Sequence, residues 1–104
     1  MYNGNNSEGS FRRLMPRKAS VPVNFICMVP DASAVSLVGD FNDWQAGAHP
    51  MQQHFDGSWQ LQVQLPHGHH RYAFAVDGKM TLDPRAQGVS RDANGQRVSL
   101  IAVS

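Results

Sequence analysis

Alternation of apolar and polar residues in the stretch SWQLQVQL, residues 58–65, is the feature that most constrains the fold. Successive side chains of a β-strand point to opposite faces, so this pattern predicts a strand with one apolar and one polar face. The apolar face carries Trp59, Leu61, Val63 and Leu65, and the polar face carries Gln60, Gln62 and Gln64. Nowhere does the chain show a convincing 3.6-residue apolar spacing. The sequence therefore predicts an all-β domain with Trp59 in its core.

Further short apolar or alternating runs, separated by Gly, Pro, Asp and Asn, predict additional strands. They cover residues 21–29, 34–39, 71–76, 80–82 and 96–104, and residues 85–95 are expected to form a loop. Asp77-Gly78 tolerates the positive φ angles of a tight hairpin turn. About six or seven strands at this spacing indicate a β-sandwich.

The strand pattern also assigns faces. In residues 21–29 it places Val21, Val23, Phe25, Cys27 and Val29 on one face, while Pro22 indicates a strand near a sheet edge. In residues 71–76 it places Tyr72, Phe74 and Val76 inward and Arg71, Ala73 and Ala75 outward. We therefore expect the three outward residues to lie away from the core.

A chain of 104 residues with 41% hydrophobic content is long enough for one domain and too short for two. We assign the domain to residues 21–104. Residues 1–20 are polar, with four basic residues against the single acidic residue Glu8, and are expected to form a flexible basic segment. This segment is either a solvated linker or a site for an acidic partner. The remainder of the chain is mildly acidic, which disfavours a nucleic-acid partner.

The cysteine count and the lengths of the apolar runs bear on the cellular compartment and on membrane association. The single cysteine, Cys27, cannot form an intramolecular disulfide, and the N-terminus lacks the apolar run of a secretory signal. A cytoplasmic setting is expected. No stretch approaches the roughly 20 apolar residues of a membrane-spanning helix, so we expect no membrane partner.

The residues that could perform catalysis or hold a metal are scattered. Asp40, Asp43, Asp56, Asp77 and Asp83 all neighbour Gly, Asn or Pro, where an Asp caps the local backbone of a turn. Cys27 lies within a predicted strand, where nothing activates a thiolate. The three histidines at positions 67, 69 and 70 lack a good fourth ligand and are expected to be solvent-exposed, and His49 and His54 are expected in a loop. We therefore predict no enzyme activity, no metal and no cofactor.

The stretch LVGDFNDWQAG, residues 37–47, interrupts the strand-like sequence with two aromatics, two carboxylates and one Asn between glycines. Phe41, with the small Gly39 before it, is expected to fill the core. Trp44 has two interpretations: it folds back over the edge of the sandwich, or it is displayed as a binding surface. The residues alone leave both open.

Three motifs together resemble a known family. SLVGDFNDW, then DGSWQLQVQLPHGHHRYAFAVDGK, then LDPRA are similar to family 48 carbohydrate-binding modules, over residues 21–103. Relatives of that family include the N-terminal domains of glycogen branching enzymes and isoamylases and the glycogen-binding domain of the beta subunit of AMP-activated protein kinase. The resemblance implies an immunoglobulin-like early-set β-sandwich.

The resemblance also implies a sugar site. In members that bind glycogen, two tryptophans form a platform for α-1,4-linked glucose, helped by a Lys and by an Asn in the last loop. Trp44 matches the first tryptophan, whereas Met80 stands at the second and Ala73 at the Lys. The Asn position falls near Val98, with Asn94 and Gln96 as the nearest polar substitutes.

These matches imply a non-catalytic module that binds α-glucan weakly. The candidate sugar-binding residues are Trp44, Lys79, Met80, Asn94 and Gln96. The alternative is a protein-interaction or regulatory module on the same scaffold that binds no sugar, with a partner that contacts the scaffold or residues 1–20.

Overall fold

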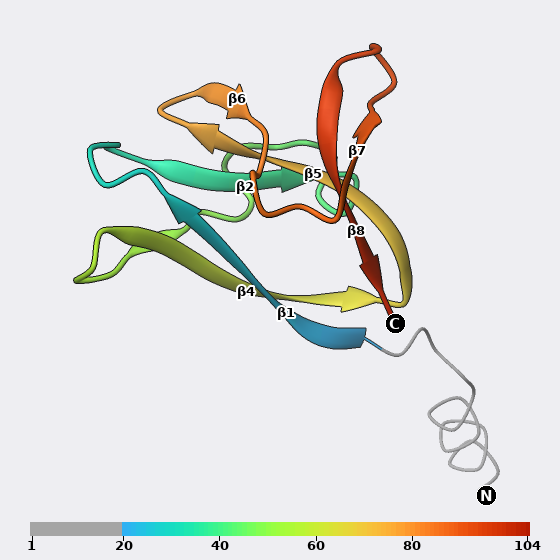
Figure 1. Ribbon diagram of the computed structural model, residues 1–104, viewed down its shortest axis with the longest axis horizontal. Helices are drawn as coiled ribbons and strands as arrows, with labels where there is room; N and C mark the ends of the chain where they lie inside the picture. The colour runs from blue at the N-terminus through green and yellow to red at the C-terminus, as the bar shows by residue number, and fades with distance from the viewer. Residues whose placement is uncertain (1–19) are drawn as a thin grey trace, which may run out of the picture.

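The computed structural model describes residues 20–104, which fold into two antiparallel β-sheets packed against each other (Figure 1). The first sheet has the order β1-β4-β3, with β1 at Ser20–Met28, β4 at Ser58–Pro66 and β3 at Gln52–Gln53. The second has the order β2-β5-β8-β7, with β2 at Val35–Gly39, β5 at Gly68–Val76, β8 at Arg97–Val103 and β7 at Gly88–Arg91. A further strand, β6 at Lys79–Thr81, pairs with the end of β5. The expected all-β sandwich is confirmed.

The core lies between the sheets and is built by the alternation that the sequence shows. Strands β1 and β4 pair in register, which sets Phe25 opposite Leu61 and Cys27 opposite Trp59. Trp59 is buried, and its indole nitrogen donates a hydrogen bond to the carbonyl oxygen of Val29 at 3.1 Å. Aromatic rings from the other sheet meet this layer, since Phe25 contacts Tyr72 edge-on with ring centroids 5.0 Å apart. The prediction that Trp59 belongs to the core is confirmed.

The outer face of β5 differs from the expectation. Ala73 and Ala75 were predicted to face outward, and they do lie on the face opposite Tyr72 and Phe74, yet both are buried. With Val38 they form a second, smaller apolar cluster, against which Trp44 and Met80 pack. They face away from the main core, as predicted, but they are not solvent-exposed, because the side chains of Trp44, from the loop after β2, and of Met80, from the neighbouring strand β6, cover them.

The tight turn between β5 and β6 is confirmed. Asp77 and Gly78 both have positive φ, 48° and 85°. The Asp77 carboxylate also accepts hydrogen bonds from the backbone nitrogens of Ser33 and Ala34, each at 2.9 Å. This carboxylate is thus a turn residue that joins two loops.

Two strands are additions to the expected set, which brings the number in the described residues to eight rather than six or seven. The predicted loop 85–95 contains β7, and the two-residue β3 follows the Trp44 region. β7 exists because its backbone pairs with β8 over four residues. The expected flexible basic segment lies outside the described residues, except for Ser20, which begins β1.

Candidate functional site

The segment after β2, residues 40–47, is called here the Trp44 loop, and its backbone is unusual. Asp43 and Trp44 both adopt left-handed conformations, with φ of 56° and 58°. Such a conformation costs a non-glycine residue roughly 1–2 kcal/mol, so it persists only where surrounding contacts hold it. One contact is direct: the carbonyl oxygen of Gly39 accepts a hydrogen bond from the Trp44 nitrogen at 2.9 Å.

Asn42 holds the loop closed from within. Its side-chain oxygen accepts a hydrogen bond from the Gly39 nitrogen at 3.0 Å, and its side-chain nitrogen donates to the carbonyl oxygen of Leu37 at 3.0 Å. The same nitrogen lies 2.8 Å from Nδ1 of His49. Because an amide NH₂ only donates, this His49 nitrogen accepts and carries no proton. His49, which the sequence placed in a loop without a role, therefore helps to shape the turn.

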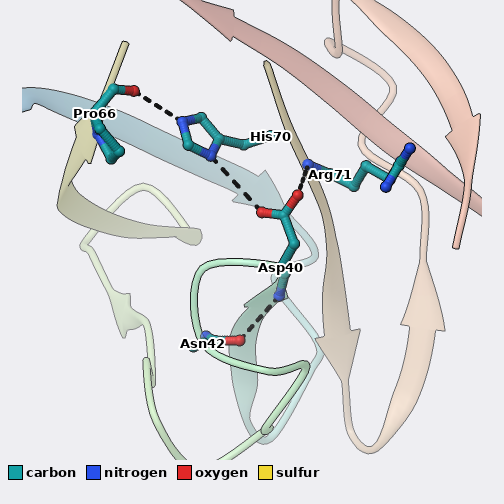
Figure 2. Close-up of polar contacts among 6 residues, drawn as sticks. Asp40, Asn42, Pro66, His70 and Arg71 are labelled. Atoms are coloured by element: carbon teal, nitrogen blue, oxygen red, sulfur yellow. Dashed lines mark hydrogen bonds and ion pairs between the residues drawn. The ribbon is translucent and has the colours of Figure 1, made fainter. Parts of the chain in front are cut away.

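Asp40 ties the loop to the neighbouring strand β5 (Figure 2). One carboxylate oxygen accepts a hydrogen bond from the Arg71 backbone nitrogen at 3.1 Å, and the Asp40 nitrogen donates to the Arg71 carbonyl at 3.0 Å. The other carboxylate oxygen lies 3.7 Å from Nδ1 of His70. Figure 2 shows His70 spanning from this carboxylate to the carbonyl oxygen of Pro66, which its Nε2 contacts at 2.8 Å. The start of the Trp44 loop is thus held to β5 by contacts with the main chain of Arg71 and with the side chain of His70.

His70 corrects a prediction made for the histidine group. His67 and His69 are exposed as expected, but the His70 side chain is only 12% exposed. Its ring packs near Phe41, with centroids 6.2 Å apart. His70 is therefore a structural support of the loop and not a solvent-exposed imidazole.

Gly39 completes these restraints by lacking a side chain. A Cβ atom at this position would lie 2.5 Å from the Phe41 ring and 2.6 Å from the Arg71 carbonyl oxygen. Phe41 uses this space to pack against the main core, as the sequence predicts. The loop thus directs one aromatic inward and leaves the next, Trp44, on the outer face.

Trp44 lines a surface hollow of about 260 Å³ together with residues from two other segments. Met80 comes from β6, and the turn between β7 and β8 supplies Asp92, Ala93, Asn94 and Gln96. The floor beneath is apolar, because Trp44 and Met80 pack on Val38, Ala73 and Ala75. Four of the five candidate residues thus lie around one hollow, named here the Trp44 hollow.

The turn that closes the hollow is fixed by its own hydrogen bonds. One Asp92 oxygen accepts from the backbone nitrogens of Asn94 and Gln96, each at 2.9 Å, and Gly95 has a φ of 82°. Within residues 20–104 no protein group engages the carboxamide of Asn94 or of Gln96. Both side chains are exposed. The turn therefore presents two unoccupied amides on a rigid backbone.

Two positions to which the family resemblance pointed lie outside the Trp44 hollow. Lys79 does not line the Trp44 hollow, and it precedes Met80 in β6, so the two side chains project to opposite faces. Val98 is completely buried. Asp92 and Ala93 line the hollow but were not predicted, although Asp92 precedes an Asn-Gly pair typical of a turn.

Two further groups, Asp56 and Cys27, have pKa values that are shifted by their place in the fold. The Ser58 hydroxyl and backbone nitrogen both donate to Asp56, which lowers the pKa of that carboxyl. Burial raises the pKa of the Cys27 thiol, so it stays protonated. Among the described residues, no group of three His, Cys, Asp or Glu side chains is arranged to hold a metal ion, and no helix is long and apolar enough to cross a membrane.

Comparison with known proteins decides the family. The family described as the glycogen recognition site of AMP-activated protein kinase matches residues 21–104, most of the chain. The chain belongs to this family. The resemblance seen in the sequence is thereby confirmed, and residues 21–104 of this chain form a carbohydrate-binding module of the glycogen-recognition type.

Similar curated proteins are much longer than this module. The chain is 34% identical over 80 residues to a 1,4-alpha-glucan branching enzyme of Nitrobacter hamburgensis, and the match covers 69% of this chain and 11% of the enzyme. It is 40% identical over 70 residues to a second such enzyme, from Xanthomonas oryzae pv. oryzae, and the match covers 62% of this chain and 10% of the enzyme. The chain thus spans about a tenth of the length of these relatives.

Proposed function

We propose that this module binds α-1,4-glucan, weakly and without catalysis, in the Trp44 hollow. The observation that carries the proposal is the convergence of Trp44, Met80, Asn94 and Gln96 around one hollow from three separate segments. The family description and the similarity to 1,4-alpha-glucan branching enzymes support glucan as the ligand class.

The hollow has the chemistry that a sugar needs. The flat face of a glucose ring is apolar at its C–H groups, and it gains by covering an aromatic ring. Sugar hydroxyls need polar partners, because unpaired hydroxyls lose free energy when they leave water. Trp44 supplies the ring, and the free carboxamides of Asn94 and Gln96 both donate and accept. One apolar face and a few placed amides are what a small carbohydrate site requires.

Weak binding follows from the second platform position. Stacking a nucleic-acid base on an aromatic side chain contributes about 1–3 kcal/mol, and we take the same range for a sugar ring. Replacing one tryptophan platform by Met80 then weakens binding about five- to two-hundredfold. Met80 offers a polarizable apolar contact but no rigid plane.

Strain in the Trp44 loop supports a binding role. A tryptophan held with φ of 58° by Gly39 and Asn42 contributes less to stability than the same residue in a relaxed turn. Backbone strain that the surroundings maintain is typical of functional positions. The loop thus favours display of Trp44 over simple coverage of the sheet.

Titration with maltoheptaose, followed by isothermal calorimetry, tests the proposal. The wild-type module should give a saturable heat, and Trp44→Ala should remove the part of that heat that comes from the Trp44 hollow. Met80→Ala should weaken binding, whereas its matched control Met28→Ala should not, because Met28 is 54% exposed and outside the hollow. No binding by the wild type at several millimolar sugar would overturn the proposal.

A protein-interaction module is the second candidate, and one observation favours it. A groove of about 350 Å³ lies between β1 and the segment after β6, with apolar walls from Ile26, Met28, Val29 and Leu82. Failure of the wild type to bind glucan, with the fold intact, would favour this function over the first.

A further inference from the structure

A second surface hollow, of about 320 Å³, lies on the β1-β4-β3 sheet, between β1, β4 and the segment that contains β3. Its polar lining consists of four carboxamides, from Asn24, Gln52, Gln60 and Gln62. We call it the amide groove. Pro50 adds apolar surface, and among residues 20–104 His54 is the one titratable side chain that lines it.

Regular strand pairing brings these amides together. Asn24 pairs with Gln62 and Gln52 pairs with Gln60 across neighbouring strands. Gln60 and Gln62 alternate along β4 with Trp59 and Val63, which are buried in the core. The glutamines therefore lie on the outer face of their sheet, whereas the Trp44 hollow lies on the outer face of the other.

Hydrogen bonds orient the amides before any ligand arrives. The Ser58 hydroxyl donates to Asp56 at 2.6 Å, so its oxygen can only accept from the Gln60 amide nitrogen, which lies 2.8 Å away. The Gln62 nitrogen donates to the Asn24 oxygen at 3.1 Å. These bonds leave the side-chain oxygens of Gln60 and Gln62 and the side-chain nitrogen of Asn24 for an external partner. The groove thus offers acceptors and a donor in fixed directions.

The lining selects for a neutral ligand rich in hydroxyl groups. Within the described part of the chain no Asp, Glu, Lys or Arg lines the groove, so a charged ligand would meet no opposite charge there. A hydroxyl group both donates and accepts, which matches the amide oxygens and the Asn24 nitrogen. Apolar surface from Pro50 can face the C–H groups of a sugar ring.

We propose that the amide groove is a second saccharide site, which binds a separate segment of glucan on the face opposite Trp44. Only the identity of the sugar rests on the proposed function of the Trp44 hollow. Two sites that face opposite ways allow one module to contact two chains of a branched particle. Such bivalent contact raises avidity for a particle without strengthening either site.

A titration of the full chain with maltoheptaose, followed by ¹⁵N–¹H NMR, reads both sites at once. The Trp44 indole N–H reports the Trp44 hollow, and the side-chain NH₂ signals of Asn24, Gln60 and Gln62 report the amide groove. The indole signal of buried Trp59 shows that each variant is folded. We expect the two sets of signals to move with different half-saturation concentrations.

Variants separate the two sites. In Trp44→Ala the amide signals should still shift, and in Gln62→Ala the shift of the Asn24 and Gln60 signals should require about tenfold more sugar. Gln64→Ala is the matched control, because Gln64 is an exposed glutamine on the same face of β4 outside the groove. It should leave the titration unchanged.

Each remaining outcome counts against one site. Amide signals that stay still while the Trp44 signal moves overturn the second site and leave the proposed function standing. Amide shifts that vanish in Trp44→Ala also overturn it, since they would be relayed from the other face. Amide shifts without a Trp44 response support the groove and overturn the Trp44 hollow.

Discussion

The two tryptophans of this module occupy opposite environments. Trp59 lies in the regular strand β4 and is buried, and its indole nitrogen donates a hydrogen bond to the Val29 carbonyl oxygen. Trp44 sits in a left-handed turn, is half-buried, and lines a surface hollow. One side chain stabilises the fold, while the other needs the fold to hold it in place. The same type of side chain therefore contributes differently to stability at the two positions, because the backbone conformation determines how much of its apolar surface is buried.

Truncation of each tryptophan gives the largest contrast. Trp59→Ala should lower the free energy of unfolding by about 3–5 kcal/mol, since it removes a buried ring and leaves a cavity. Trp44→Ala should lower it by about 1 kcal/mol or less. Urea denaturation measures both. Equal losses would show that Trp44 is a core residue and would remove the basis of the comparison.

A second ring beside Trp44 should sharpen the contrast in binding. Met80→Trp places a rigid plane on the same floor of the hollow, so glucan affinity should rise about five- to two-hundredfold. Met28→Trp is the control, because Met28 lies outside the hollow. Calorimetry with maltoheptaose gives the affinities, and a Met80→Trp variant that binds no tighter would contradict the platform role of this position.

Asn42 should couple loop shape to binding without touching the hollow. Asn42→Ala removes the bonds to Gly39, Leu37 and His49, and should cost about 1–2 kcal/mol of stability. It should also weaken glucan binding, because Trp44 loses its fixed position. Asn42→Asp keeps the acceptor for the Gly39 nitrogen and should lie between wild type and Asn42→Ala. Unchanged affinity in Asn42→Ala would mean that Trp44 needs no preorganisation.

Tyr72 extends the comparison to a buried aromatic with a polar tip. Its hydroxyl donates to Asp83 at 2.6 Å, and burial, followed by this hydrogen bond, raises the pKa of Tyr72 far above its usual value of 10.0. Above that pH the unfolded chain releases the phenol proton while the folded protein retains it, so stability falls as pH rises.

Tyr72→Phe should cost about 1 kcal/mol at neutral pH and should flatten this alkaline loss. Urea unfolding at pH 8 and at about pH 11 measures the difference. An equal alkaline loss in both proteins would assign the effect to other groups.

The sandwich was predictable where alternation is strong. The pattern of β4 placed Trp59 inward, and Asp77-Gly78 identified a turn whose two positive φ angles are observed. β7 was missed because GVSR carries one exposed apolar residue, Val89, and its strand character comes from pairing with β8. Ala73 was placed outward by alternation, which cannot report that Trp44 and Met80 return to cover it.

The candidate site was predictable from the family resemblance more than from local pattern. Trp44, Met80, Asn94 and Gln96 surround one hollow, yet no spacing rule connects residues so far apart in the chain. Lys79 was among the candidate sugar-binding residues because it ends one of the family motifs, but strand alternation directs its side chain away from that of Met80. The roles of His49 and His70 were hidden because their partners, Asn42 and Asp40, are brought close only by the turn itself.

The attachment of the Trp44 loop to β5 bears on protein engineering. Asp40 is fastened to Arg71 and faces His70, and Gly39 is confined by the Arg71 carbonyl. A graft of residues 40–47 alone onto another sandwich would leave these anchors behind. The smallest transplantable unit is therefore the loop together with the stretch of β5 that faces it, and a designer who moves one must move both.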